Sequence, residues 1–102
     1  MAIVEVTIVP LGTGTPSVSQ YVADCHKVLE QATDLKVQLT PTSTVIEGEL
    51  DLILETIRKM HETPFERDAQ RVMTMIRIDD RRDKEQTMAG KIKAVTDKLQ
   101  LR

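Results

Sequence analysis

The stretch KVQLTPTSTVIEGE, residues 36–49, contains two β-like segments separated by a turn. Residues 36–40 alternate apolar and polar side chains, which is the period of a strand with one buried face. The Pro-Thr-Ser that follows favours a turn, and residues 44–48 predict a second short strand. A helix is expected from about Glu49. Two neighbouring strands therefore occupy the middle of the chain, and a helix follows them.

A strand and a helix precede this stretch. Residues 2–9 alternate like a strand, and the proline and glycines of residues 10–14 end the pattern. Thr15 or Ser17 can cap a helix, and Ser17 and Gln20 have the spacing of a capping box. Apolar residues then recur at the three- and four-residue steps of one buried helical stripe: Val18, Tyr21, Val22, Cys25, Val28, Leu29 and Ala32.

A helix, a strand and a further helix follow the central stretch. Apolar residues between Leu50 and Met60 have helical spacing, and Pro64 is expected to stop that helix. Residues 71–79, RVMTMIRID, form the longest β-like run. The last segment carries apolar residues at steps of four, three and four, which predicts a third helix: Met88, Ile92, Val95 and Leu99.

The predicted order is β-α-β-β-α-β-α. Two β-α-β units with one helix each fit a four-stranded antiparallel sheet that carries both helices on one face. This is the α+β ferredoxin-like sandwich with an additional C-terminal helix. At 102 residues the chain has the size of one domain, so we expect a single ferredoxin-like domain over residues 1–102.

This topology leaves the second face of the sheet bare. A surface that mixes valine, methionine and isolated charges is too apolar to leave exposed to water, and burial against another subunit is the simplest way to cover it. We therefore predict a homo-oligomer that packs through its sheet faces. The residues expected on the bare face are Glu5, Thr7, Val9, Gln38, Val45, Glu47, Met73, Met75 and Arg77.

Composition excludes several functions. The net charge of −2 offers no basic excess for DNA or RNA, and one Tyr, one Phe and no Trp offer few surfaces for base stacking. The start of the chain has Glu5 in its apolar run and no basic region before it, so neither a signal peptide nor a membrane span is expected. The lone Cys25 cannot form an internal disulfide, and a cytoplasmic location is the expectation.

Two segments carry candidate ligand-binding residues. The loop GTGTPSVS, residues 12–19, leads into a helix N-terminus, where Ser17 and Ser19 can contact a ligand or simply form a turn and a cap. In the second segment, Thr44 offers a hydroxyl and Glu47 projects onto the bare face. Because an unpaired buried carboxylate is costly, Glu47 needs a donor. A ligand amine or an arginine, either Arg77 or one from another subunit, would serve.

Other polar residues give no catalytic or metal set. His26 and His61 lie on different predicted helices without suitably spaced ligands, and Cys25 lies on a buried stripe. The run RIDDRRDKE, residues 77–85, is typical of a solvated face or of ion pairs between subunits; its Asp79–Arg82 part could also line an ion site. We find no nucleophile, base and oxyanion donor together, and expect no enzyme, no metal and no cofactor.

Four motifs together resemble the family of small thiamine-binding proteins. The first is the opening strand that ends in Pro10, and the second is the Gly-Thr…Pro-Ser-Val-Ser loop into Tyr21-Val22-Ala23. The third and most specific is Pro41-x-x-Thr44-x-Ile46-Glu47-Gly48-Glu49, and the fourth is the run from Arg71-Val72 to Asp79-Asp80-Arg81. The likeness extends over nearly the whole chain.

The resemblance implies a ferredoxin-like fold, assembly into dimers and dimers of dimers (a homotetramer), and binding of thiamine or its hydroxymethylpyrimidine half without catalysis. It favours Thr44 and Glu47 as ligand contacts, supported by Ser17 and Ser19. Our leading hypothesis is a cytoplasmic oligomer that binds thiamine or a related aminopyrimidine. The alternative is a purely structural or regulatory homo-oligomer, in which Glu47 is an ion-pair partner between subunits.

Overall fold

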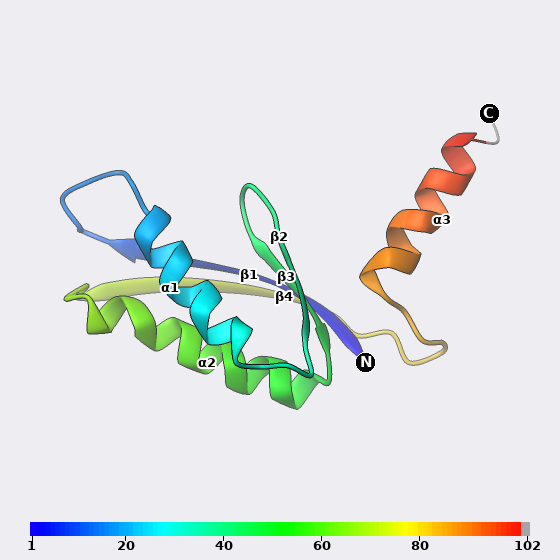
Figure 1. Cartoon of the computed structure of the whole chain (residues 1–102), viewed down its shortest axis with the longest axis horizontal. Helices are drawn as coiled ribbons and strands as arrows, with labels where there is room; N and C mark the ends of the chain where they lie inside the picture. The colour runs from blue at the N-terminus through cyan, green and yellow to red at the C-terminus, as the bar shows by residue number, and fades with distance from the viewer. Residues whose placement is uncertain (101–102) are drawn as a thin grey trace.

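The computed structural model describes residues 1–100, so the last two positions of the expected domain lie outside the described residues. The chain forms a four-stranded antiparallel sheet and three helices, in the predicted order β-α-β-β-α-β-α (Figure 1). The sheet order is β2-β3-β1-β4. The elements are β1 (Ala2–Leu11), α1 (Ser19–Glu30), β2 (Lys36–Leu39), β3 (Thr44–Gly48), α2 (Leu50–Glu66), β4 (Arg71–Asp79) and α3 (Met88–Gln100). The predicted ferredoxin-like fold is confirmed.

One face of the sheet and the inner faces of α1 and α2 enclose the core. The strand register places Val4 beside Ile46 on one side and beside Ile78 on the other, so these side chains share a face. Their neighbours one position along each strand point to the opposite, bare face. The fully buried core residues include Val4, Val6, Ile46, Ile53 and Met60, and Cys25 and Leu29 of α1 join the same cluster.

The proline of α2 lies inside the helix, not at its end. The sequence predicted that Pro64 stops the helix, but α2 continues to Glu66. A proline has no N–H for the carbonyl of Met60, four residues earlier. The Thr63 hydroxyl donates to that carbonyl at 2.8 Å, and the Cys25 thiol donates to it at 3.6 Å. Two side-chain donors therefore replace the backbone hydrogen bond that Pro64 cannot make. Burial of the Cys25 thiol raises its pKa.

The first helix begins later than the capping pattern suggested. Its N-cap is Val18, which makes no side-chain capping bond, and Gln20 donates to Asp24 rather than back to a cap. The preceding loop satisfies its own polar groups instead, because the Ser17 N–H donates to the Thr15 hydroxyl at 3.3 Å. The predicted capping box between Ser17 and Gln20 is therefore wrong.

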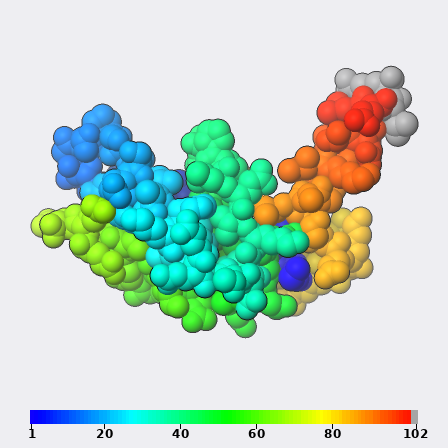
Figure 2. Space-filling view, in the orientation of Figure 1, coloured from blue at the N-terminus to red at the C-terminus, as the bar shows by residue number. Residues whose placement is uncertain are grey.

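The third helix stands apart from the rest of the molecule (Figures 1 and 2). Its first turn is held by polar contacts: Lys91 forms an ion pair with Asp79, and the Gln86 amide donates to the Asp79 carbonyl at 3.0 Å. Beyond that turn its apolar side chains remain exposed: Ile92, Val95 and Leu99. None of the helices within residues 1–100 combines the length and the apolar character needed to cross a membrane.

Candidate functional site

An apolar pocket opens between α1, β1 and the loop that joins β2 to β3. It encloses about 340 Å³, and Figure 2 shows the surface hollowed between α1 and the β2–β3 hairpin. Its walls are mainly aliphatic, with Val18 and Val22 from the start of α1 and Leu39 from the end of β2. These three side chains are exposed in the described chain although they are apolar. An exposed apolar wall around a concave site is what a small ligand would cover.

Hydroxyl groups form one rim of this pocket. The turn between β2 and β3 is closed by Thr40 and Ser43: the Thr40 hydroxyl donates to the Ser43 carbonyl at 2.9 Å and accepts from the Ser43 N–H at 3.0 Å. Thr44 follows directly and also lines the pocket. Its hydroxyl makes no side-chain hydrogen bond to any part of residues 1–100, so it can donate to or accept from a ligand. The hydroxyls of Thr40 and Ser43 are thus occupied by each other, whereas those of Thr42 and Thr44 make no side-chain hydrogen bond within residues 1–100.

The two predicted serines lie next to this pocket. Ser17 and Ser19 are exposed and flank Val18, which lines the pocket wall. Neither serine is among the lining residues in the described part of the chain. The structure thus gathers Ser17, Ser19 and Thr44 around one hollow, with Thr44 as the direct lining residue.

Glu47 does not join them. Side chains alternate along a strand, so Thr44 and Ile46 point towards the helices, whereas Val45 and Glu47 point to the bare face. Thr44 and Glu47 therefore lie on opposite faces of the sheet. Residues three apart on one strand cannot contact the same small molecule from one side.

The Glu47 carboxylate is buried, with an exposed fraction of 3%, because the start of α3 covers it. Oε1 accepts a hydrogen bond from the Met88 N–H at 3.0 Å, and the Lys36 ammonium lies 4.0 Å from Oε2. Arg77, the partner considered from the sequence, instead lies 3.5 Å from Glu5. Glu47 thus has its donor within the chain, at the N-terminus of a helix where negative charge is favourable.

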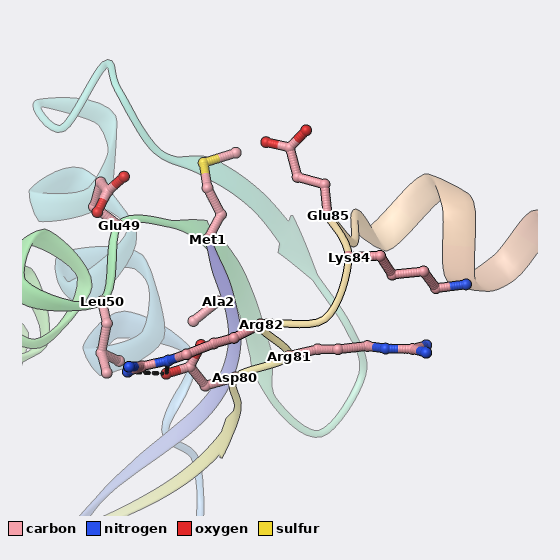
Figure 3. A pocket seen from close by; sticks show the side chains of 9 residues that line it. All are labelled: Met1, Ala2, Glu49, Leu50, Asp80, Arg81, Arg82, Lys84 and Glu85. Carbon is pink, nitrogen blue, oxygen red and sulfur yellow. Dashed lines mark hydrogen bonds and ion pairs between the residues drawn. The ribbon is translucent and has the colours of Figure 1, made fainter.

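A second, charged hollow of about 440 Å³ lies at the start of α2 (Figure 3). Arg82 lies along Asp80, with Nη2 2.8 Å from Oδ2, and holds the pKa of that carboxyl below its usual value. Arg81 extends away and binds Asp83, whose pKa it lowers to about 2. These ion pairs are made within one segment, which is the pattern of a solvated charged run. The basic groups here are largely neutralised by their neighbours.

The residues that form the wall of the apolar pocket were not predicted from the sequence. Val22 and Leu39 looked like ordinary members of a buried helical stripe and a buried strand face, yet both are exposed at the pocket mouth. One signal was present: Leu39 is the last residue of a short strand, and polar turn residues follow it directly. No set of three or more potential metal-ligating side chains occurs among residues 1–100.

The fold and this pocket define a small α+β protein of the ferredoxin-like type with a site of small-molecule size. The family model of thiamine-binding proteins matches residues 4–96, and the chain belongs to that family. It is 55% identical to the UPF0045 protein YqgV of Bacillus subtilis, over 98% of this chain and 99% of that one.

Solved structures agree with the fold. The crystal structure of the hypothetical protein MJ1052 from Methanocaldococcus jannaschii is 41% identical, with a TM-score of 0.85 over 93% of this chain and 95% of that one. A candidate thiamine biosynthesis/salvage protein of Thermotoga maritima has a TM-score of 0.71 at 19% identity, over 92% and 97% of the two chains. The second likeness shows the shared fold.

Proposed function

We propose that this protein binds thiamine or a related aminopyrimidine, such as hydroxymethylpyrimidine, without transforming it. The observation that carries the proposal is the apolar pocket of about 340 Å³ with the free Thr44 hydroxyl on its rim. Pockets for small molecules are mostly apolar with a few placed polar groups, and begin at about 300 Å³. Membership in the thiamine-binding family and the name of the Thermotoga maritima protein support the same ligand class.

The pocket chemistry favours the pyrimidine half of thiamine. No ionised side chain of residues 1–100 lines the pocket, so the cationic thiazolium ring is better placed at the mouth, in water. In this proposal a flat neutral ring rests against the apolar wall that Val22 and Leu39 contribute to. The Thr44 hydroxyl would donate to a ring nitrogen or accept from the exocyclic amine. In this proposal Thr44 recognises the ligand, and Ser17 and Ser19 shape the entrance.

Glu47 has a different role in the proposal. Its carboxylate holds the first turn of α3 and lies on the face of the sheet opposite Thr44. A contact between Glu47 and the ligand would require that the carboxylate release the Met88 N–H and that the site include the bare face. A ligand contact with Glu47 is therefore the alternative to a contact with Thr44, and variants of the two residues distinguish them.

The experiment is calorimetric titration with thiamine, hydroxymethylpyrimidine and the thiazole alcohol half of thiamine. Thr44→Val keeps the shape and removes the hydroxyl, and we expect it to weaken pyrimidine binding about tenfold or more, as the loss of one hydrogen bond predicts. Thr33→Val, an exposed position away from the pocket, is the matched control. If wild type and Thr44→Val bind with equal affinity and Glu47→Gln binds more weakly, the ligand-binding site lies on the bare face of the sheet. Conversion of the ligand during the titration would mean that the protein is an enzyme.

The second candidate function is a structural or regulatory homo-oligomer that packs through the bare sheet face. The exposed Met73 and Met75 on this face favour such a contact. Val45→Lys places a charge on β3 in the middle of that face, and we expect it to reduce the molar mass measured by light scattering. An unchanged mass would exclude this face as the contact. An oligomer without affinity for any pyrimidine would favour the purely structural role.

A further inference from the structure

The first strand has an unpaired edge beside the apolar pocket. β1 pairs with β4 as far as Leu11, but its pairing with β3 ends at Val6, where Thr44 is the partner. Figure 1 shows β1 and β4 continuing together beyond the hairpin of β2 and β3. On the side where β3 has ended, the backbone of residues 7–11 therefore has no neighbouring strand within residues 1–100.

The pocket borders this edge of the strand. Four successive residues of β1 line it: Val6, Thr7, Ile8 and Val9. Successive side chains point to opposite faces of a sheet, so a pocket on one face would touch only every second residue. Contact with all four requires that the hollow meet the strand from its side, where unpaired backbone N–H and C=O groups project.

The hydrogen bonds of the neighbouring hairpin indicate which backbone groups face the pocket. The Thr40 N–H donates to the Ser43 carbonyl at 2.9 Å, so these two residues are a hydrogen-bonded pair. Bonded and non-bonded pairs alternate along antiparallel strands, so the next residue, Thr44, turns its backbone groups away from β2 and towards Val6. Ile8, two residues further along β1, has the same orientation as Val6. Its N–H and C=O therefore point to the side where β3 has ended.

Two further observations agree with this orientation. Pro10 has no N–H, yet β1 pairs with β4 before and after it, as expected if Pro10 faces the open side together with Ile8. The Thr42 carbonyl, which would be opposite Ile8 if the pairing with β3 continued, accepts from the Thr7 hydroxyl at 3.5 Å instead. Within residues 1–100, the Ile8 N–H and C=O have no hydrogen-bond partner in a turn, a loop or a side chain.

We propose that the Ile8 N–H and C=O recognise the ligand by pairing with one edge of its aminopyrimidine ring. The pairing rests on the proposed function of the pocket and names the backbone groups that select the ligand there. A 4-aminopyrimidine presents a ring nitrogen acceptor next to an amine donor, which complements a strand residue with one free donor and one free acceptor. The amine carries a second hydrogen, which the Thr44 hydroxyl can accept. The ring then occupies the place that the next residue of β3 would take.

Amide hydrogen exchange measured by NMR reports directly on the Ile8 N–H. In the free protein this amide should exchange faster than those of Thr7 and Val9, which face β4. Saturating hydroxymethylpyrimidine should slow the exchange of the Ile8 amide about tenfold or more and change that of Thr7 and Val9 little. Slow exchange of the Ile8 amide in the free protein, or unchanged exchange in the saturated protein, would overturn the pairing.

A pair of variants removes the backbone donor alone. Ile8→Ala and Ile8→Pro both shorten the side chain, but only proline lacks the N–H. Thr7 is already in an extended strand, which is the conformation that a following proline favours, so Ile8→Pro should fold. It should bind hydroxymethylpyrimidine about tenfold more weakly than Ile8→Ala in calorimetric titration, and equal affinities would overturn the pairing. The exchange measurement on wild type decides the matter if Ile8→Pro does not fold.

A ligand analogue tests the backbone acceptor. The analogue of hydroxymethylpyrimidine that lacks the amine should bind about tenfold more weakly than hydroxymethylpyrimidine itself, both to wild type and to Thr44→Val. The difference should persist in Thr44→Val because the Ile8 carbonyl still selects the amine. Equal affinity of the two compounds for Thr44→Val would assign the amine to Thr44 alone and would overturn the pairing.

Failure of the pairing and failure of the proposed function give different results. Binding of hydroxymethylpyrimidine in the calorimeter without protection of the Ile8 amide would keep the proposed function and overturn the pairing. The absence of both binding heat and any change in amide exchange would overturn the two together.

Discussion

The Glu47 carboxylate accepts a hydrogen bond from the Met88 N–H at 3.0 Å and so joins the centre of the sheet to the first turn of α3, 41 positions later. The Thr87 hydroxyl caps the same turn by accepting from the Gly90 N–H at 2.9 Å. α3 has 13 residues, a length at which an isolated helix is marginal in water. The first turn of α3 therefore depends on the Glu47 carboxylate and the Thr87 hydroxyl as hydrogen-bond acceptors.

Glu47→Ala should release α3 from the sheet. It leaves the Met88 N–H without its acceptor, which costs about 1–3 kcal/mol, and hydrogen exchange of the amides in the first turn of α3 should speed up accordingly. Glu47→Gln keeps a carbonyl oxygen at the same position and should leave this exchange nearly unchanged. Equal protection in wild type and Glu47→Ala would show that the carboxylate does not hold the helix.

Gly48 is required by close packing, not by its backbone conformation. Its φ lies outside the left-handed region, but a Cβ at this position would lie 2.5 Å from Leu35 Cδ2. Gly48→Ala should therefore destabilise the protein by about 1–3 kcal/mol in urea unfolding, the usual range for overpacking. Leu35→Val removes the clashing methyl group, so the double variant should lose less than the sum of the two single losses. Strict additivity would argue against the clash.

The Thr63 hydroxyl should contribute to stability because it donates to the Met60 carbonyl, which receives no N–H from Pro64. Thr63→Val removes this donor from the Met60 carbonyl and should lower the free energy of unfolding by about 1 kcal/mol. Thr56→Val is the matched control: this hydroxyl is also buried and donates to the carbonyl of Leu52 in the preceding turn of the same helix, but that carbonyl retains its helical N–H donor. The two substitutions should differ in thermal denaturation, with Thr63→Val the more damaging.

Filling the pocket should abolish binding without unfolding the protein. Val22→Phe adds a ring at an exposed wall position, so the free energy of unfolding should change by no more than about 0.5 kcal/mol. Thiamine and hydroxymethylpyrimidine should then no longer raise the melting temperature of the variant. For wild type, a ligand present at one hundred times its dissociation constant should increase the free energy of unfolding by about 2.7 kcal/mol. Val95→Phe, on the exposed side of α3, should leave binding intact. Undiminished binding by Val22→Phe would place the ligand elsewhere.

The ion pair between Asp24 and Arg67 should make stability depend on acid pH. Arg67 donates from Nη2 to Asp24 Oδ1 at 3.2 Å and holds the pKa of that carboxyl below its ordinary value of 3.8. Because the folded pKa is the lower one, the contribution is fully present above about pH 4 and is lost as the pH falls through the folded value. The melting temperatures of wild type and Asp24→Asn should therefore converge as the pH falls through the folded pKa of Asp24. A constant difference across the titration would contradict this linkage.

Periodicity was enough to predict the elements and their order. The alternation of residues 71–79 and the helical spacing of Met88 to Leu99 are local properties, and the structure has a strand and a helix at these positions. The strand faces were also predictable, because alternate side chains must point to opposite sides of a sheet. The start of α1 was not predictable, since the Thr15 hydroxyl satisfies the loop in competition with the expected capping box.

The site depended on contacts between segments far apart in the chain. The sequence determined that Thr44 and Glu47 lie in one strand and, through their spacing, that they face opposite sides. Only the tertiary structure decided what meets each of them: the wall of α1 near Thr44, and the start of α3 over Glu47. Local patterns encode local conformation, but which distant groups bury a carboxylate or enclose a hollow depends on how the finished elements pack.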